Sequence, residues 1–121
     1  MRSYAAWFAV LMGVGMIGMW TMFFIAGDVP ELEAEPIRLG FHLVAEGSTA
    51  VMLIVAGIGV ARRAVWARGT YLFAAGLLAY TLIVSPGYFG QQGQWGFVAM
   101  FAGFAALAAI AVRAAMRSTA D

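Results

Sequence analysis

The sequence predicts an all-α fold, an integral membrane four-helix bundle whose helices run up and down across a bilayer. Hydrophobic residues make up 64 % of the chain and charged residues 11 %, whereas about 25 % of the residues in a soluble domain are charged. The mean hydropathy of +0.88 agrees with this imbalance. Four apolar stretches, at about 4–26, 39–61, 70–88 and 94–112, each approach the roughly 20 residues that cross a bilayer. We therefore predict one domain over residues 1–121.

The first stretch is expected to be a retained helix rather than a signal peptide. Its apolar core exceeds the usual length of about 7–15 residues, and no A-x-A cleavage site precedes Asp28. Its glycines, Gly13, Gly15 and Gly18, follow no strand that could belong to a phosphate-binding loop. We expect all three to allow close helix packing.

The other three stretches carry their own signals. Pro36 suits the first turn of the second helix, where a missing N–H is tolerated. Pro86 is expected to end or kink the third helix. In the fourth, small residues share one face and phenylalanines the opposite one, so we expect the small face to pack inward and the phenylalanines to face lipid. The small residues are Ala99, Ala102, Ala106 and Ala109, and the phenylalanines are Phe97, Phe101 and Phe104.

The distribution of arginines predicts the orientation. Six of the seven basic residues, Arg2, Arg62, Arg63, Arg68, Arg113 and Arg117, fall on the side of the two termini, and only Arg38 falls on the other side. By the positive-inside rule we expect both termini to be cytoplasmic. We also expect a multi-pass protein of the bacterial inner (plasma) membrane. The arginines form no basic face, so nucleic acid is not an expected partner. The absence of cysteine excludes disulfides and thiolate metal sites.

Ionisable residues in the second stretch give the strongest functional signal. Arg38, His42, Glu46 and Thr49 fall on one stripe of a helix. Ionisable side chains inside a bilayer cost at least about 2.5–3.5 kcal/mol each, so they are functional candidates. Residues from the other helices are expected at matching depth in the outer half of the bundle: Thr21 from the first, and Thr81, Ser85 and Tyr88 from the third. Together they predict a polar pocket.

Three other interpretations of these residues stay open. The Arg38–His42–Glu46 stripe could be a structural strut between helices, because buried ionisable residues usually pair. His42 and Glu46 could share a metal ion with Asp28 or Glu35, although one histidine falls short of a zinc ligand set and the nearby arginine opposes a cation. The stripe of Met12, Met16, Met19 and Phe23 admits copper or a haem with His42, but is more typical of packing. No metal or cofactor is favoured.

The chain resembles the DoxX-like group of small four-helix bacterial membrane proteins. The similarity rests on length, the four stretches, Glu46, and the run from Leu53 to Gly57 that leads into an arginine loop and a third helix with Tyr80 and Thr81. It implies a link to quinone-coupled or thiol-redox membrane complexes. The His-x-x-x-Glu spacing is also similar to that of sterol-isomerase-type membrane proteins, which implies acid/base work. His42 itself is a departure from the DoxX-like pattern.

Three functions follow from these observations. In the favoured one, the pocket binds or conducts a small ligand or protons in the outer leaflet. In the second, His42 and Glu46 act as an acid/base pair on a lipophilic substrate such as a quinone or isoprenoid, so enzymatic activity is left open. In the third, the protein is an accessory subunit of a larger membrane complex. Besides the lipid bilayer, we expect a homo-oligomer or such a complex as partner, because transport by a bundle of this size would need an oligomer.

Overall fold

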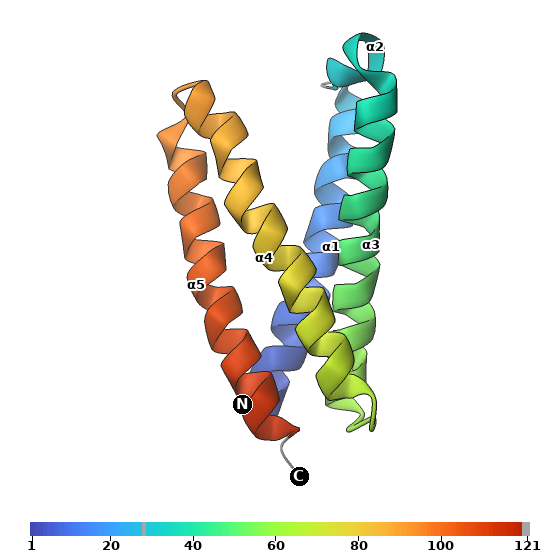
Figure 1. Ribbon diagram of the computed structural model, residues 1–121, viewed down its shortest axis with the longest axis vertical. Coiled ribbons are helices and arrows are strands. Elements are labelled where there is room, and N and C mark those ends of the chain that lie inside the picture. The colour runs from blue at the N-terminus through green and yellow to red at the C-terminus, as the bar shows by residue number, and fades with distance from the viewer. Residues whose placement is uncertain (28, 120–121) are drawn as a thin grey trace.

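The computed structural model describes residues 1–27 and 29–119, and within them the chain is entirely helical apart from short turns (Figure 1). Each of the four long helices is long and apolar enough to cross a membrane. The predicted all-α four-helix bundle is confirmed. The helices are α1 (Arg2–Ala26), the short α2 (Glu31–Ala34), α3 (Pro36–Ala61), α4 (Ala67–Gln91) and α5 (Trp95–Ser118).

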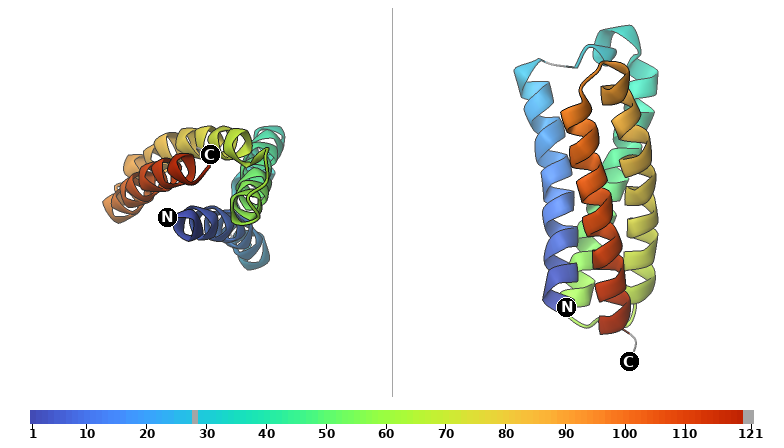
Figure 2. Two further views of the ribbon diagram at one scale, coloured as in Figure 1. Left: turned by 90° about the horizontal axis from the view of Figure 1, so that it is seen from below. Right: turned by 90° about the vertical axis from the view of Figure 1, so that its left-hand side faces the viewer.

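The long helices form a ring in which α1 packs between α3 and α5, and α4 packs between the same two helices. Both termini lie at one end of the bundle, here called the termini end, whereas α2 and the α4–α5 turn lie at the other, the α2 end (Figure 1). The α1–α3 and α4–α5 hairpins converge at the termini end and diverge toward the α2 end (Figures 1 and 2). The bundle is therefore tapered.

Small residues explain the close approach of α1 and α3. A Cβ on Gly57 would lie 2.8 Å from the carbonyl oxygen of Ala6, and a Cβ on Gly13 would lie 2.6 Å from that of Ala50. Neither space can hold a side chain, because a backbone atom cannot move aside as a flexible side chain can. The prediction of packing glycines is thus right for Gly13 but wrong for Gly15 and Gly18, where a Cβ would have no neighbour within 4 Å.

Hydrogen bonds between helices are concentrated at the termini end. The buried Tyr71 hydroxyl on α4 donates to the carbonyl oxygen of Ala5 at 2.8 Å. The Arg2 guanidinium donates to the carbonyl oxygens of Val60 and Ser118, in the last turns of α3 and α5. These bonds join all four long helices.

Aromatic packing takes over between α4 and α5 toward the α2 end. The Phe89 ring stacks on Phe97 with centroids 4.6 Å apart and on Phe101 at 5.7 Å. The predicted faces of α5 are right only for Phe97, which is exposed: Phe101 is buried and Phe104 half-buried. The small face is instead exposed, because the divergence of the hairpins leaves a space that only large side chains fill. The exposed small residues are Ala99, Ala102, Ala106 and Ala109.

The helices extend beyond the predicted stretches. Pro36 occupies the first turn of α3, as predicted. Pro86, however, lies inside α4, which continues to Gln91, so of the two predicted outcomes, an end or a kink, the helix does not end at this proline. Proline removes only one backbone hydrogen bond, and the stacking of Phe89 beyond it supplies packing for the last turn.

The orientation predicted from the arginines can be tested with single cysteines. The chain has no cysteine of its own, and Glu33 and Val65 are both exposed, at opposite ends of the bundle. In intact cells an impermeant maleimide is expected to label Glu33→Cys and to reach Val65→Cys only after the membrane is opened. Equal labelling of both variants before opening would contradict the four-span topology.

Candidate functional site

Glu46 is the central residue of the site. Only 7 % of its surface is exposed, and Thr49, one turn further along α3, is buried as well. The two residues face inward because α3 packs between α1 and α4. The Thr49 hydroxyl donates to the carbonyl oxygen of Ala45 at 2.8 Å, so its donor is already used within α3. Glu46 is thus the acidic group that the inner face of α3 can offer to a ligand.

His42 lies one turn from Glu46 on the same face. Its Nε2 is 3.8 Å from Oε1 of Glu46, the contact expected at a spacing of four residues. The His42 side chain is 46 % exposed, whereas that of Glu46 is 9 % exposed. The imidazole ring also meets the ring of Trp20 on α1 edge-on, with centroids 5.6 Å apart. His42 therefore links the carboxylate to the accessible surface and to α1.

Thr81 approaches the carboxylate from α4. The predicted meeting of Glu46 and Thr81 at the same depth thus takes place in the structure. It occurs on the side of α3 away from Trp20, since α3 lies between α1 and α4. Glu46 thus lies on α3, the helix that contacts both α1 and α4.

A groove between α1 and α3 borders the carboxylate. Its cavity volume is about 220 Å³. Glu46 and Thr21 are the polar side chains in its wall, and apolar groups form the remainder. The groove, called here the Glu46 groove, is lined by Met16, Ile17, Trp20, Thr21, Phe24, Leu43, Glu46, Gly47 and Ala50. Gly47 keeps it open, because the position of its absent Cβ has no neighbour within 4 Å.

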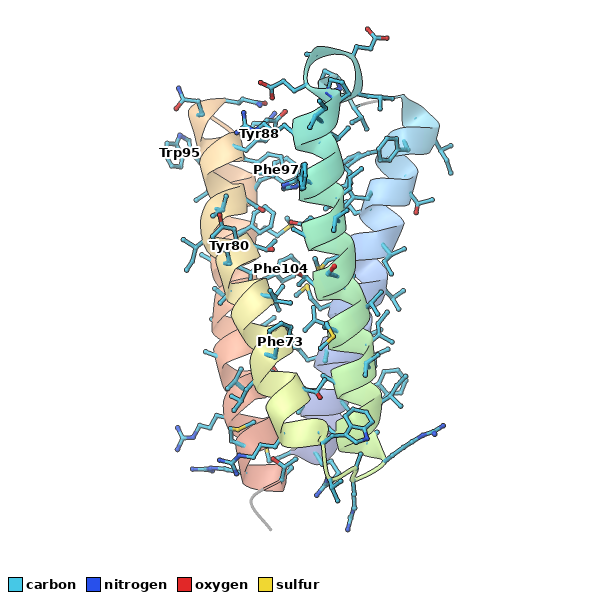
Figure 3. The ribbon with its side chains drawn as sticks, turned by 45° about the vertical axis from the view of Figure 1, so that its right-hand side comes forward. Phe73, Tyr80, Tyr88, Trp95, Phe97 and Phe104 are labelled. Atoms are coloured by element: carbon cyan, nitrogen blue, oxygen red, sulfur yellow. The ribbon has the colours of Figure 1, made fainter. Side chains whose placement is uncertain are left out.

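The other predicted site residues do not all gather here. Arg38 is 82 % exposed and pairs with Glu35 at 3.4 Å, at the start of α3. Ser85 is half-buried on α4, and Tyr88 is exposed and packs edge-on against Phe89. Figure 3 shows Tyr88 near the α2 end with Trp95, beyond Tyr80 along α4. Thr21 does line the groove, although its hydroxyl donates to the carbonyl oxygen of Ile17.

Metal and haem interpretations gain no ligand set from these contacts. Within the part of the chain that the structure describes, no three histidine, cysteine, aspartate or glutamate side chains come together. Asp28, one of the suggested oxygen ligands, lies outside the described residues. Of the methionine stripe, Met16 lines the groove beside the carboxylate. Apart from Glu46 and Thr21, the side chains that line the groove with Met16 are apolar.

Sequence reasoning missed Trp20, Phe24 and Gly47. The antiparallel register of α1 and α3 accounts for the place of Trp20. Ala6 meets Gly57, and Gly13, seven residues later on α1, meets Ala50, seven residues earlier on α3. Two more helical turns along each helix in the same directions place Trp20 next to Leu43 and His42. The observed contact between the Trp20 and His42 rings follows this register.

Comparison with known proteins identifies a family for the whole chain. A family model described as a domain of unknown function (DUF8058) matches residues 1–121, so the chain belongs to this family. No curated protein and no solved structure matches the chain. The site must therefore be interpreted from its own geometry.

Proposed function

We propose that this member of the DUF8058 family binds a small amphipathic molecule of the membrane in the Glu46 groove. The apolar part of the molecule would lie on the side chains of α1 and α3, with its head group beside Glu46 and His42. The observation that carries the proposal is a buried carboxylate in the wall of a groove that is otherwise almost wholly apolar.

The cost of this carboxylate supports a ligand site. An acidic group in the membrane interior is costly by several kcal/mol, and such residues commonly mark substrate or proton pathways. A strut would need a close partner on both oxygens, but the 3.8 Å contact with His42 is longer than a hydrogen bond. A mostly apolar pocket with a few convergent polar groups is the usual form of a small-molecule site.

The groove's place in the fold supports access from the lipid. It lies in the half of the hairpin nearer the α2 end, between Met16 and Phe24 on α1. With the predicted orientation, this is the outer leaflet of the inner membrane. An alternative is an enzyme, because His42 and Glu46 are the kind of pair that acid/base catalysis needs. Conversion of a bound quinone or isoprenoid to a product would favour this alternative. The quinone would agree with the DoxX-like resemblance.

Blocking the groove tests the proposal. Gly47→Leu should fill the groove without touching the backbone, because the glycine Cβ position is open. Gly40→Leu, two turns away on α3 and equally open, is the matched control. In a protein whose only tryptophan is Trp20 (Trp7, Trp66 and Trp95 replaced by Phe), we titrate ten-carbon probes in nanodiscs and follow Trp20 emission.

We expect saturable binding of at least one of the three probes, namely decanol, decanoate and decyltrimethylammonium. Gly47→Leu should weaken it at least about tenfold, or about 1.4 kcal/mol, while Gly40→Leu should leave it unchanged. If no probe gives a saturable change that Gly47→Leu removes, the groove is not a binding site.

A further inference from the structure

We infer that the head group held in the Glu46 groove is a cation, so that the ligand is a lipophilic ammonium or a similar compound. The inference rests on the proposed function and names the ligand class for the same groove. It is carried by the charges around the carboxylate and by the aromatic rings beside it.

The first argument is the missing permanent cation. Among the described residues, Glu46 is the one ionisable side chain that lines the groove. The nearest arginine on α3, Arg38, is exposed and already pairs with Glu35. The remaining arginines lie at the termini end, on the ends of the helices or in the α3–α4 loop. Only His42 can offer positive charge, and its contact with one carboxylate oxygen is 3.8 Å long. A bound cation would supply the missing opposite charge.

The second argument is the aromatic wall. Trp20 and Phe24 line the groove together with Glu46, and their rings pack with centroids 6.2 Å apart. Phe23 also meets Trp20 edge-on, with centroids 6.1 Å apart. Aromatic faces attract organic cations, with tryptophan the strongest, and aromatic cages are a common means of binding quaternary ammonium groups.

The third argument separates a cation from the other head groups. An anion in this groove would meet the Glu46 carboxylate as a like charge. A neutral head group, such as the carbonyl of a quinone, would bring no positive charge to the carboxylate, and the Thr21 hydroxyl in the same wall already donates to the carbonyl oxygen of Ile17. The exposed Glu33 and Glu35 near the start of α3 outnumber Arg38. Acidic groups at that end raise the local concentration of cations.

The three ten-carbon probes differ only in head group, and so they test the inference directly. In the Trp20-only protein, decyltrimethylammonium is expected to bind at least about tenfold more tightly than decanol, and decanoate to give no saturable change. Glu46→Gln, which keeps the shape but removes the charge, should bring the cation down to the affinity of decanol. Glu46→Asp should retain the preference for the cation.

The outcomes separate the inference from the proposed function. If decanol binds as tightly as the cation and Gly47→Leu still removes that binding, the groove is a ligand site but its ligand is not cationic. If the cation binds best but Glu46→Gln leaves its preference intact, the carboxylate is not the recognition group and the inference is wrong. Should Glu46→Gln fail to fold, the order of the three probes on the unsubstituted carboxylate decides.

Discussion

Leucine at Gly57 or at Gly13 is expected to abolish the folded bundle. Both glycines lie where α1 and α3 are closest, and even a methyl group there would come within 2.8 Å of a carbonyl oxygen on the opposite helix. Alanine at either position should already cost about 1–3 kcal/mol, the usual cost of overpacking a tight core. Leucine would force the two helices apart along the whole hairpin, because helices are stiff.

The same helix contains a matched control for this expectation. Gly15 and Gly18 have open space around their Cβ positions, so Gly15→Leu and Gly18→Leu should leave the bundle intact. The variants are purified in detergent and heated, and size-exclusion chromatography then measures the fraction of each that is still folded at each temperature. Equal melting temperatures for Gly13→Leu and Gly15→Leu would contradict the observed hairpin packing.

Arg2→Ala is expected to produce the second-largest loss of stability, about 2–3 kcal/mol, since hydrogen bonds from a charged donor contribute about 1.5–3 kcal/mol each and this side chain is only half-buried. Its guanidinium bonds to carbonyl oxygens in the last turns of both α3 and α5. The Val60 oxygen also accepts from the backbone N–H of Arg63 at 3.2 Å, so the guanidinium is its second donor. Helix C-termini also favour positive charge. The substitution therefore removes the one side chain that joins the ends of α3 and α5, here called the Arg2 clamp.

Two substitutions isolate the clamp from the charge. Arg2→Lys keeps the charge but lacks the forked donor geometry, so it should recover only part of the lost stability. Arg62→Ala removes an exposed arginine at the end of α3 and should change the melting temperature little. If Arg62→Ala destabilised the protein as much as Arg2→Ala, the positive charge at this end, rather than the hydrogen bonds, would be responsible.

Hydropathy was sufficient to predict the four helices, since a stretch apolar on every side can only be satisfied in lipid or in a core. It was not sufficient for the faces of α5. Small residues favour close packing, but whether they face inward depends on the local distance between helices. Phe101 is buried and Phe104 half-buried, whereas Phe97 is exposed. Likewise, a glycine in the sequence does not by itself show where helices touch. Gly13 lies against the opposite helix, whereas Gly15 has open space around its Cβ position.

The site was predictable where it depended on one helix. Spacing alone brings His42 next to Glu46, and matching depth brought Thr81 to the same carboxylate. Arg38 was misplaced because a long side chain near a helix start can turn back, here to Glu35. Trp20 was missed because its contact with His42 depends on the register between α1 and α3, which the close approaches at Gly57 and Gly13 fix.

The taper of the bundle makes each hairpin a lever with its pivot at the termini end. A helix of 25 residues, such as α4, is about 37 Å long at 1.5 Å per residue. A rotation of about 5° at the pivot therefore carries the far end of α4 through about 3 Å, and Thr81, somewhat beyond its middle, through about half that distance. That displacement is comparable with the length of a polar contact and would change the distance from Thr81 to Glu46, while the hydrogen bond of Tyr71 to Ala5 near the pivot hardly changes. The carboxylate thus lies where small tilts of α4 have a chemical effect at little cost in packing.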